Sequence, residues 1–192
     1  MTRAGHLVVV SGAPGTGKST VAAALAEDLG RALLSLDTVK EALADSLGLG
    51  DERWSDRLGD AAAEVVFTLA EANPRAVLEG WWRRERRARV IERFPGAVEV
   101  FCRCDGPLAE DRMRTRHKGG ARHPIHRDVI NPAILDRVGE LCDTTRPLSL
   151  GGPLLQLDTN GHLERVTLVA WVRRACSEGD HENGAVLPSN GS

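Results

Sequence analysis

Short apolar runs alternate with longer segments of helical periodicity along most of this chain. The apolar runs, each short enough to be a buried strand, cover residues 6–11, 32–36, 75–79, 97–102 and 154–157. The helical patterns between and after them cover residues 18–29, 38–47, 56–72, 84–93, 107–116, 128–141 and 162–176. This alternation predicts an α/β fold in which helices cover both faces of a parallel sheet.

The length and composition favour one main domain. A chain of 192 residues with 42% hydrophobic residues can bury a single α/β core, which we assign to residues 1–176. Residues 177–192 have almost nothing to bury, so we expect a disordered tail. The excursion from Lys118 to Asn131 is rich in glycine, proline and charge, and it predicts a mobile lid that spans about residues 112–131.

The charge balance gives no overall case for a nucleic-acid or membrane partner. The formal net charge is −2, and no apolar run approaches membrane-spanning length. The start of the chain leads into the first strand without a signal-peptide pattern, so we expect a cytoplasmic protein. Composition leaves the oligomeric state open.

The first strand runs into the sequence GAPGTGKST, which matches the phosphate-binding pattern G-x-x-x-x-G-K-[ST]. Its glycines allow turns in which successive N–H groups point at phosphate oxygens. Lys18 would reach the β and γ phosphates, and the Ser19 hydroxyl would bind Mg²⁺. The residues expected to hold the nucleotide are therefore Gly12, Ala13, Pro14, Gly15, Thr16, Gly17, Lys18, Ser19 and Thr20.

Ligands of such sheets bind beyond the carboxyl ends of the strands, where this chain places two acids. Asp37 follows the second strand; it is expected to cap the next helix and to orient, or take a proton from, an attacking hydroxyl. Lys40 lies one turn later and would bind an anionic group of the substrate, pair with Asp37, or remain a solvated surface lysine. Glu79 ends the third strand, where it would support Mg²⁺ or serve a structural role.

Trp81 and Trp82 come directly after Glu79. Adjacent side chains of an extended segment point in opposite directions, so one tryptophan is expected in the core. The other would line the acceptor pocket, although packing alone explains both equally well.

Arginines are concentrated in the predicted lid. Arg112 and Arg116 are four residues apart and share one helix face, and Arg122 follows. Phosphoryl transfer needs cations over the migrating group, for which Arg116 and Arg122 are favoured, with Arg112 next. Arg112 is also expected to bind the nucleotide, and plain surface charge is the alternative for each of the three. Asp158 and Thr159, after the last strand, lie where the nucleotide base would be contacted, although an ordinary turn explains them nearly as well.

Six further arginines crowd residues 83–93. A solvated helix face with partial pairing to Glu85 and Glu92 is the simpler interpretation. The alternative is a basic patch for a polyanion.

The segments GAPGTGKST, LSLDTVKEAL, AVLEGWW and RTRHKGGARHPIHRD together resemble small P-loop kinases of the AAA_33 or zeta-toxin and chloramphenicol-phosphotransferase-like group. The resemblance covers residues 5–176. It implies a three-layer, nucleoside-kinase-like fold with a five-stranded parallel sheet of order 2-3-1-4-5, ATP as donor, Asp37 as base, and Arg116 with Arg122 as lid arginines. His123 and His126 match the lid segment without an assigned role. Trp81, Trp82 and Ile125 depart from the usual pattern on the acceptor side.

The sequence therefore predicts an ATP- and Mg²⁺-dependent phosphotransferase that acts on a hydroxyl of a small molecule, such as a nucleoside, sugar or antibiotic. Two alternatives stay open. One is a polynucleotide 5′-hydroxyl kinase that uses the basic helix, and the other is a nucleotide-sensing module that transfers nothing.

Overall fold

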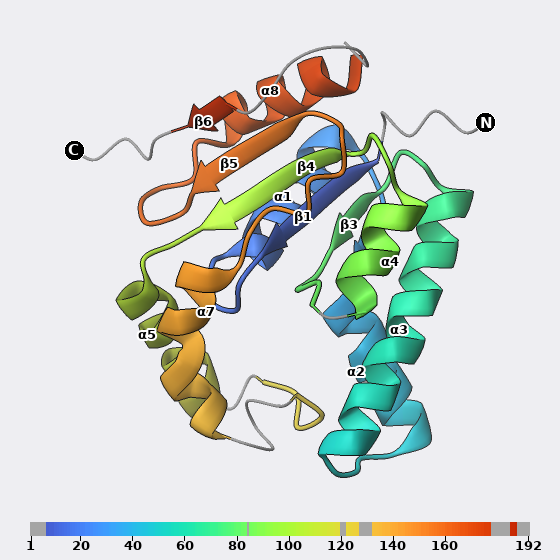
Figure 1. The fold of residues 1–192 in the computed structure, drawn as a ribbon, viewed down its shortest axis with the longest axis vertical. Coiled ribbons are helices and arrows are strands. Elements are labelled where there is room, and N and C mark those ends of the chain that lie inside the picture. The colour runs from blue at the N-terminus through green and yellow to red at the C-terminus, as the bar shows by residue number, and fades with distance from the viewer. Residues whose placement is uncertain (1–6, 84, 120–121, 127–131, 178–184, 188–192) are drawn as a thin grey trace.

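The computed structural model describes residues 7–83, 85–119, 122–126, 132–177 and 185–187, and it has the predicted α/β architecture (Figure 1). Its strands are β1 (Val8–Gly12), β2 (Leu33–Ser35), β3 (Val77–Glu79), β4 (Val98–Arg103), β5 (Leu154–Asp158) and β6 (Ala185–Leu187). Its α-helices are α1 (Lys18–Leu29), α2 (Leu36–Leu47), α3 (Glu52–Ala72), α4 (Glu85–Arg93), α5 (Gly106–Lys118), α7 (Val138–Thr144) and α8 (Arg165–Ser177), and a 3₁₀ helix, η2, covers Pro132–Arg137.

The strands form one parallel sheet of order β2-β3-β1-β4-β5-β6 over the described residues. The first five positions have the predicted order 2-3-1-4-5. The sixth strand, Ala185–Leu187, lies in the segment expected to be disordered. That expectation does not hold at these three residues, because their backbone pairs with the outer edge of β5. The rest of the expected tail lies outside the described residues, apart from Ser177, which ends α8.

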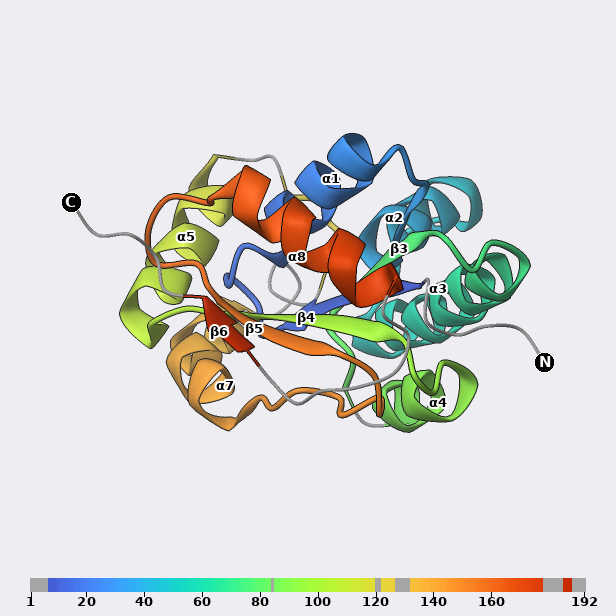
Figure 2. The same ribbon diagram turned by 90° about the horizontal axis from the view of Figure 1, so that it is seen from above.

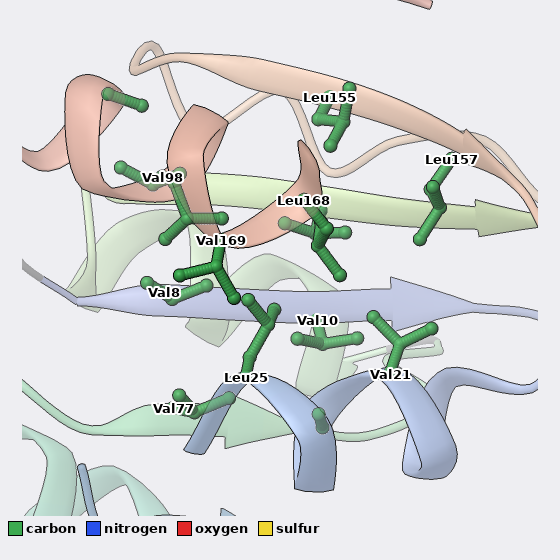
Figure 3. Packing of buried hydrophobic residues seen from close by; sticks show 14 of the residues in the cluster. Val8, Val10, Val21, Leu25, Val77, Val98, Leu155, Leu157, Leu168 and Val169 are labelled. Carbon is green, nitrogen blue, oxygen red and sulfur yellow. The ribbon is translucent and has the colours of Figure 1, made fainter. Parts of the chain in front are cut away.

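The two faces of the sheet carry separate cores, because side chains alternate along each strand. Val8 and Val10 of β1 face α1 and α8, where they pack with Leu25 and Leu168 (Figure 3). Val9 lies in the opposite cluster, which α3 and α4 complete. Figure 2 shows these helices on the two sides of the sheet. Since both faces are covered, the strands are mostly apolar, although β4 contains Glu99 and β5 contains Gln156. Glu79 and Asp158 lie at the carboxyl ends of their strands.

Most element boundaries differ from the predicted ones by one to four residues, and two of the differences bear on the site. Helix α2 begins at Leu36, and the Ser35 hydroxyl caps it by accepting from the Thr38 N–H at 3.5 Å. Asp37 is therefore not the cap, because the hydroxyl two residues earlier already fills that place.

The helix expected over residues 128–141 is also different, although residues 128–131 lie outside the described part. The chain forms η2 and then α7. Leu135 of η2 and Val138, the first residue of α7, lie in one buried cluster with Ala109 and Met113 of α5.

No helix among the described residues combines the length and the apolar character needed to cross a membrane.

Candidate active site

The loop between β1 and α1 has the backbone shape that its glycines make possible. Gly15 and Gly17 have φ angles of 79° and 75°, in the left-handed region that residues with a Cβ rarely adopt. A Cβ on Gly15 would also lie 2.4 Å from the carbonyl oxygen of Ala109, and one on Gly12 would lie 2.7 Å from that of Cys102. The loop is thus pressed against β4 and α5, which fix its shape.

The N-terminus of α1 opens directly at this loop. Gly17 is its N-cap without a side-chain hydrogen bond, and no acidic residue lies in the first turn of this fully described helix. The first N–H groups and the helix dipole therefore favour an anion here. The ammonium of Lys18 lies 3.4 Å from the Ala13 carbonyl oxygen, so it folds back over the same loop.

Glu79 joins this loop to the end of β2. Its side chain is buried, and its Oε1 accepts from the Ser19 hydroxyl at 3.1 Å while its Oε2 accepts from the Ser35 hydroxyl at 2.8 Å. Hydroxyl and carboxylate oxygens are ligands that Mg²⁺ prefers. Among the described residues no cluster of three or more histidine, cysteine or acidic side chains could hold a metal ion by itself. The Ser19 hydroxyl and the Glu79 carboxylate instead suit a Mg²⁺ ion whose remaining ligands are water molecules and phosphate oxygens.

Asp37 lies in the first turn of α2, above the carboxyl ends of the strands. One of its carboxylate oxygens is 3.1 Å from the Arg122 guanidinium and the other is 4.0 Å from His126 Nδ1. Burial raises the pKa of this carboxyl, but the charges of protonated His126, Arg122 and Lys18 outweigh it and hold the pKa at about 2. Asp37 is therefore ionised at neutral pH and can accept a hydrogen bond from a hydroxyl.

The segment with Arg122, part of the predicted lid, contacts one face of α2. Asp37, Glu41 and Asp45 are spaced four residues apart, so their carboxylates lie on one helix face. The described lid residues meet this acidic stripe in three pairs: Arg122 with Asp37 at 3.1 Å, His126 with Glu41 at 2.6 Å and His123 with Asp45 at 3.0 Å. These pairs hold the lid over the cavity described below.

The hydrogen bonds of the two lid histidines indicate which ring nitrogen carries the hydrogen in the neutral form of each. Ile125 N–H donates to His123 Nδ1 at 3.1 Å, so His123 carries its proton on Nε2 and donates it to Asp45. His126 is buried, and burial lowers its pKa despite the neighbouring Asp37 carboxylate. Its Nε2–H is then the donor to Glu41. Both histidines, which sequence reasoning left without a role, thus attach the lid to α2.

A cavity of about 220 Å³ lies between α2, α3, the lid and the segment after β3. Its lining includes Asp37 and Lys18, together with Trp81. The two tryptophans point apart: Trp82 is buried against Phe67, with ring centroids 5.5 Å apart, whereas Trp81 is only partly buried and faces the cavity. Lys40 also lines the cavity, but it is buried rather than solvated.

A second, larger hollow of about 1090 Å³ opens on the other side of the P-loop. It shares Gly15 and Arg116 with the first, so the P-loop lies at their junction. Arg112 and Thr159 line this groove, and Arg112 donates to the Thr159 carbonyl at 2.8 Å. Arg116 is exposed and borders both hollows.

Asp158 does not line this groove. Its carboxylate accepts from the Asn160 N–H at 2.8 Å, which closes the turn after β5. The interpretation of this segment as an ordinary turn therefore fits Asp158, whereas Thr159 faces the groove. The Thr159 hydroxyl contacts the Thr16 carbonyl at 2.9 Å and so braces the P-loop.

Sequence reasoning missed several residues of the cavity. Arg83 and Arg86 line it, although the sequence placed them on a solvated helix face or in a basic patch for a polyanion. Ser55 is fully buried beside it; the Lys40 ammonium donates to the Ser55 hydroxyl at 2.7 Å, which in turn donates to the Ile125 carbonyl at 2.7 Å. These residues are distant in the chain, so only the register of α3 against α2 and α4 could have indicated them.

The arginines on the outer side of α4 are paired with carboxylates of α3. Arg93 contacts Glu71 and Glu64, and Arg89 also contacts Glu64. Arg87 donates to the carbonyl oxygens of residues 146 and 147. The simpler interpretation, a helix face that is solvated and partly paired, fits these side chains. Their carboxylate partners, however, lie on α3 and are not Glu85 and Glu92.

A P-loop on a parallel sheet, with an ionised aspartate and arginines over the loop, defines a P-loop kinase. The AAA_33 family model, described as an AAA domain, matches residues 7–135, so this chain belongs to the AAA_33 family. It is 31% identical over 151 residues to a shikimate kinase from Thermobifida fusca, covering 79% of this chain and 73% of that protein.

Solved structures agree with this assignment. A protein from Chloroflexus aurantiacus that is provisionally described as a kinase is 34% identical, with a TM-score of 0.76 and coverage of 88% of this chain and 97% of that one. A gluconokinase from Sinorhizobium meliloti shares the fold at 18% identity, with a TM-score of 0.54 over 91% of this chain and 93% of that one.

Proposed function

We propose that this protein transfers the γ-phosphoryl group of Mg-ATP to a hydroxyl of a small molecule bound in the cavity at Asp37. The observation that carries the proposal is the position of Asp37, which lines the same cavity as Lys18 and Ser19 of the P-loop. The kinases among the similar proteins support phosphoryl transfer in general.

In the proposed reaction the acceptor hydroxyl oxygen forms a bond to the γ-phosphorus as the bond to the β,γ-bridging oxygen breaks, and ADP leaves. Asp37 accepts the hydrogen bond of the attacking hydroxyl and orients it; the proton passes to the carboxylate or to the transferred phosphoryl group. Lys18 and the P-loop amides hold the phosphates, while Arg116 and Arg122 offset charge in the transition state.

Ser19 is the residue proposed to hold Mg²⁺, with Glu79 supporting it from the buried side. The ion, when bound with ATP, neutralises charge on the β and γ phosphates. Arg112 and Thr159 are proposed to contact the nucleotide in the larger groove, which has room for a nucleoside.

A panel of nucleosides, sugars, sugar acids, antibiotics and 5′-hydroxyl oligonucleotides, incubated with Mg-ATP, tests the proposal. Mass spectrometry should show one small molecule that gains a phosphoryl group, and Lys18→Ala and Asp37→Asn should abolish or strongly reduce that gain. Tight ATP binding with no transfer to any member would instead favour the nucleotide-sensing module.

Oligonucleotide phosphorylation would favour the polynucleotide kinase. The basic helix that suggested that alternative has its outer arginines paired with α3 carboxylates, so the structure adds no support to it.

A further inference from the structure

The cavity at Asp37 carries more positive charge than the γ-phosphoryl group requires. Two carboxylates, Asp37 and Asp56, line it, while the whole chain has a net charge of −2. The cationic side chains that line it are Lys18, Lys40, Arg83, Arg86, Arg116, Arg122 and Arg137. The P-loop lysine and the lid arginines are accounted for by the phosphates, and Arg137 is exposed and paired with Glu140. Lys40, Arg83 and Arg86 remain. Arg83 and Arg86 each have a carboxylate partner, Asp56 and Asp60, but both partners are partly exposed to solvent.

Lys40 is held in an environment that is unfavourable for a charge. It is 8% exposed, and burial lowers its pKa to about 8. Its ammonium donates a hydrogen bond to the neutral Ser55 hydroxyl at 2.7 Å, and no carboxylate of the described residues lies within ion-pair distance of it. An anion in the cavity would stabilise the ammonium.

Three residues of α3, Asp56, Gly59 and Asp60, place Arg86 beside the cavity. Asp60, whose side chain is mostly exposed, binds the Arg86 Nε at 2.7 Å, and the Asp56 carbonyl accepts from its Nη2 at 3.2 Å. Gly59 leaves room for the guanidinium, since a Cβ there would lie 2.6 Å from Nη2. A glycine inside a helix is less favourable than alanine, so α3 gives up stability where Arg86 crosses it.

Arg83 lies beside Trp81, the tryptophan that lines the cavity. Its guanidinium lies 4.9 Å from the centre of the Trp81 ring and 3.4 Å from Asp56. Lys40, Arg83 and Arg86 come from α2, the segment after β3 and α4, and all three line the same cavity as Asp37. We call them the distal cationic group.

We propose that the acceptor is an anion, a small hydroxylated molecule whose carboxylate or phosphate binds the distal cationic group of Lys40, Arg83 and Arg86 while its reacting hydroxyl lies at Asp37. This rests on the proposed function for the hydroxyl, but the anion site can be tested without turnover. A guanidinium pair beside an ammonium suits carboxylate and phosphate oxygens alike.

The first experiment observes Lys40 directly. The chain has three lysines, Lys18, Lys40 and Lys118, so [ε-¹³C]lysine labelling gives few NMR signals. The protein is saturated with Mg²⁺ and a non-hydrolysable ATP analogue, which occupies the P-loop, and is titrated with malonate or inorganic phosphate. The charged groups that act on Lys40 are Asp37, Asp56, Arg86 and Arg122.

We expect one of these anions to raise the pKa of Lys40 from about 8 to above roughly 9, with Lys118 unchanged as an internal control. Malonate and phosphate distinguish the carboxylate from the phosphate. Arg86→Gln should weaken the response at least tenfold, whereas Arg93→Gln, on the outer side of α4, should leave it intact. A Lys40 signal that neither anion moves would overturn the proposal.

The second experiment tests the acceptor with matched pairs in the presence of Mg-ATP: D-gluconate with D-glucitol, and D-glucose 6-phosphate with D-glucose. Each pair offers similar hydroxyls with and without an anion. The charged member should be preferred at least tenfold in kcat/KM, and Arg86→Gln should raise its KM more than it lowers kcat. Equal use of a neutral partner would overturn the anionic acceptor. Absence of transfer, with the Lys40 response intact, would contradict the proposed function alone.

Discussion

Two arginine-rich regions of this molecule look alike in sequence and differ in their surroundings. On the outer side of α4, the guanidinium groups of Arg89 and Arg93 are matched by two carboxylates on the exposed face of α3, Glu64 and Glu71. The lining of the cavity beneath the lid has seven cationic side chains and two carboxylates, and Arg86 and Arg137 also pair with Asp60 and Glu140 outside it. The number of arginines in a segment therefore says little about function. The acidic side chains that a neighbouring helix brings to them decide whether they pair or bind.

The largest expected difference between the two regions is in catalysis. Arg122→Gln removes a cation that lies against Asp37 beside the P-loop cavity, so kcat should fall by about 10³-fold, as for other arginines that stabilise a transferring phosphoryl group. Arg93→Gln removes an equally paired arginine outside the cavity and should leave kcat within about twofold. Steady-state kinetics of the two variants, with the acceptor found in the panel, compare the regions directly. Equal losses in both would mean that the variants act through folding, and an active Arg122→Gln would remove the lid arginine from the mechanism.

A smaller effect is expected at Glu79, the buried carboxylate beside the cavity. Glu79→Gln replaces an oxygen that accepts from the Ser19 or Ser35 hydroxyl with an amide donor, which disturbs the hydroxyl proposed for Mg²⁺. The Mg²⁺ concentration for half-maximal activity should rise about 10- to 100-fold. Glu99→Gln is a matched control, because Glu99 is equally buried in β4 but accepts from Ser11 and from the backbone N–H groups of residues 148 and 149. A similar Mg²⁺ shift in both variants would contradict a role for Glu79 at the metal.

The third test uses acid. The pKa of Asp37 is about 2, below its ordinary value of 3.8. The ionised carboxylate therefore stabilises the fold fully at pH values above about 3.8. This contribution is lost as the pH falls towards 2. The free energy of unfolding of the wild-type protein should therefore drop more steeply between about pH 4 and pH 2 than that of Asp37→Asn. Denaturant unfolding at a series of pH values measures both slopes, and parallel slopes would show that the lid pairing does not depend on this carboxylate.

Local pattern was enough to predict the parts of the site that depend on short-range chemistry. The glycines of the P-loop, Lys18 and Ser19 follow from one nine-residue motif and from the strand and helix on either side of it. The opposite directions of Trp81 and Trp82 follow from extended backbone. The order of the first five strands came from the resemblance, and the sheet confirms it.

The parts that failed depend on contacts between distant segments. Ser35 and Asp37 can both cap a helix, and the sequence could not decide which one is the N-cap of α2; the structure places Ser35 there and Asp37 in the first turn. The pairing of α4 arginines with α3, and the hydrogen bonds from Lys40 through Ser55 to Ile125, need the packing of helices that are far apart in the chain. The same is true of the acidic stripe of α2, whose spacing is visible in the sequence but whose partners in the lid are not.

The smallest expected effect is the stability of the outer pairing itself. Arg93 makes two hydrogen bonds to Glu71, at 2.7 and 2.8 Å, but the carboxylates that it meets are about half exposed. Without Arg93 they return to water at little cost, so Arg93→Gln should lower the free energy of unfolding by no more than about 1 kcal/mol, or roughly 2–4 °C in Tm.

This difference should also depend on salt and pH. Arg93 lowers the pKa of Glu71 through its hydrogen bond, so the pair stabilises the fold above the usual glutamate range and loses that contribution as the pH falls below it. Calorimetry at low and high salt, and at about pH 7 and pH 3, should show that the difference in Tm between the wild type and Arg93→Gln is smaller at high salt and smaller at pH 3. A loss of several kcal/mol that persists in high salt would mean that Arg93 acts through its packing over Phe67, 5.3 Å from the ring centre, rather than through charge.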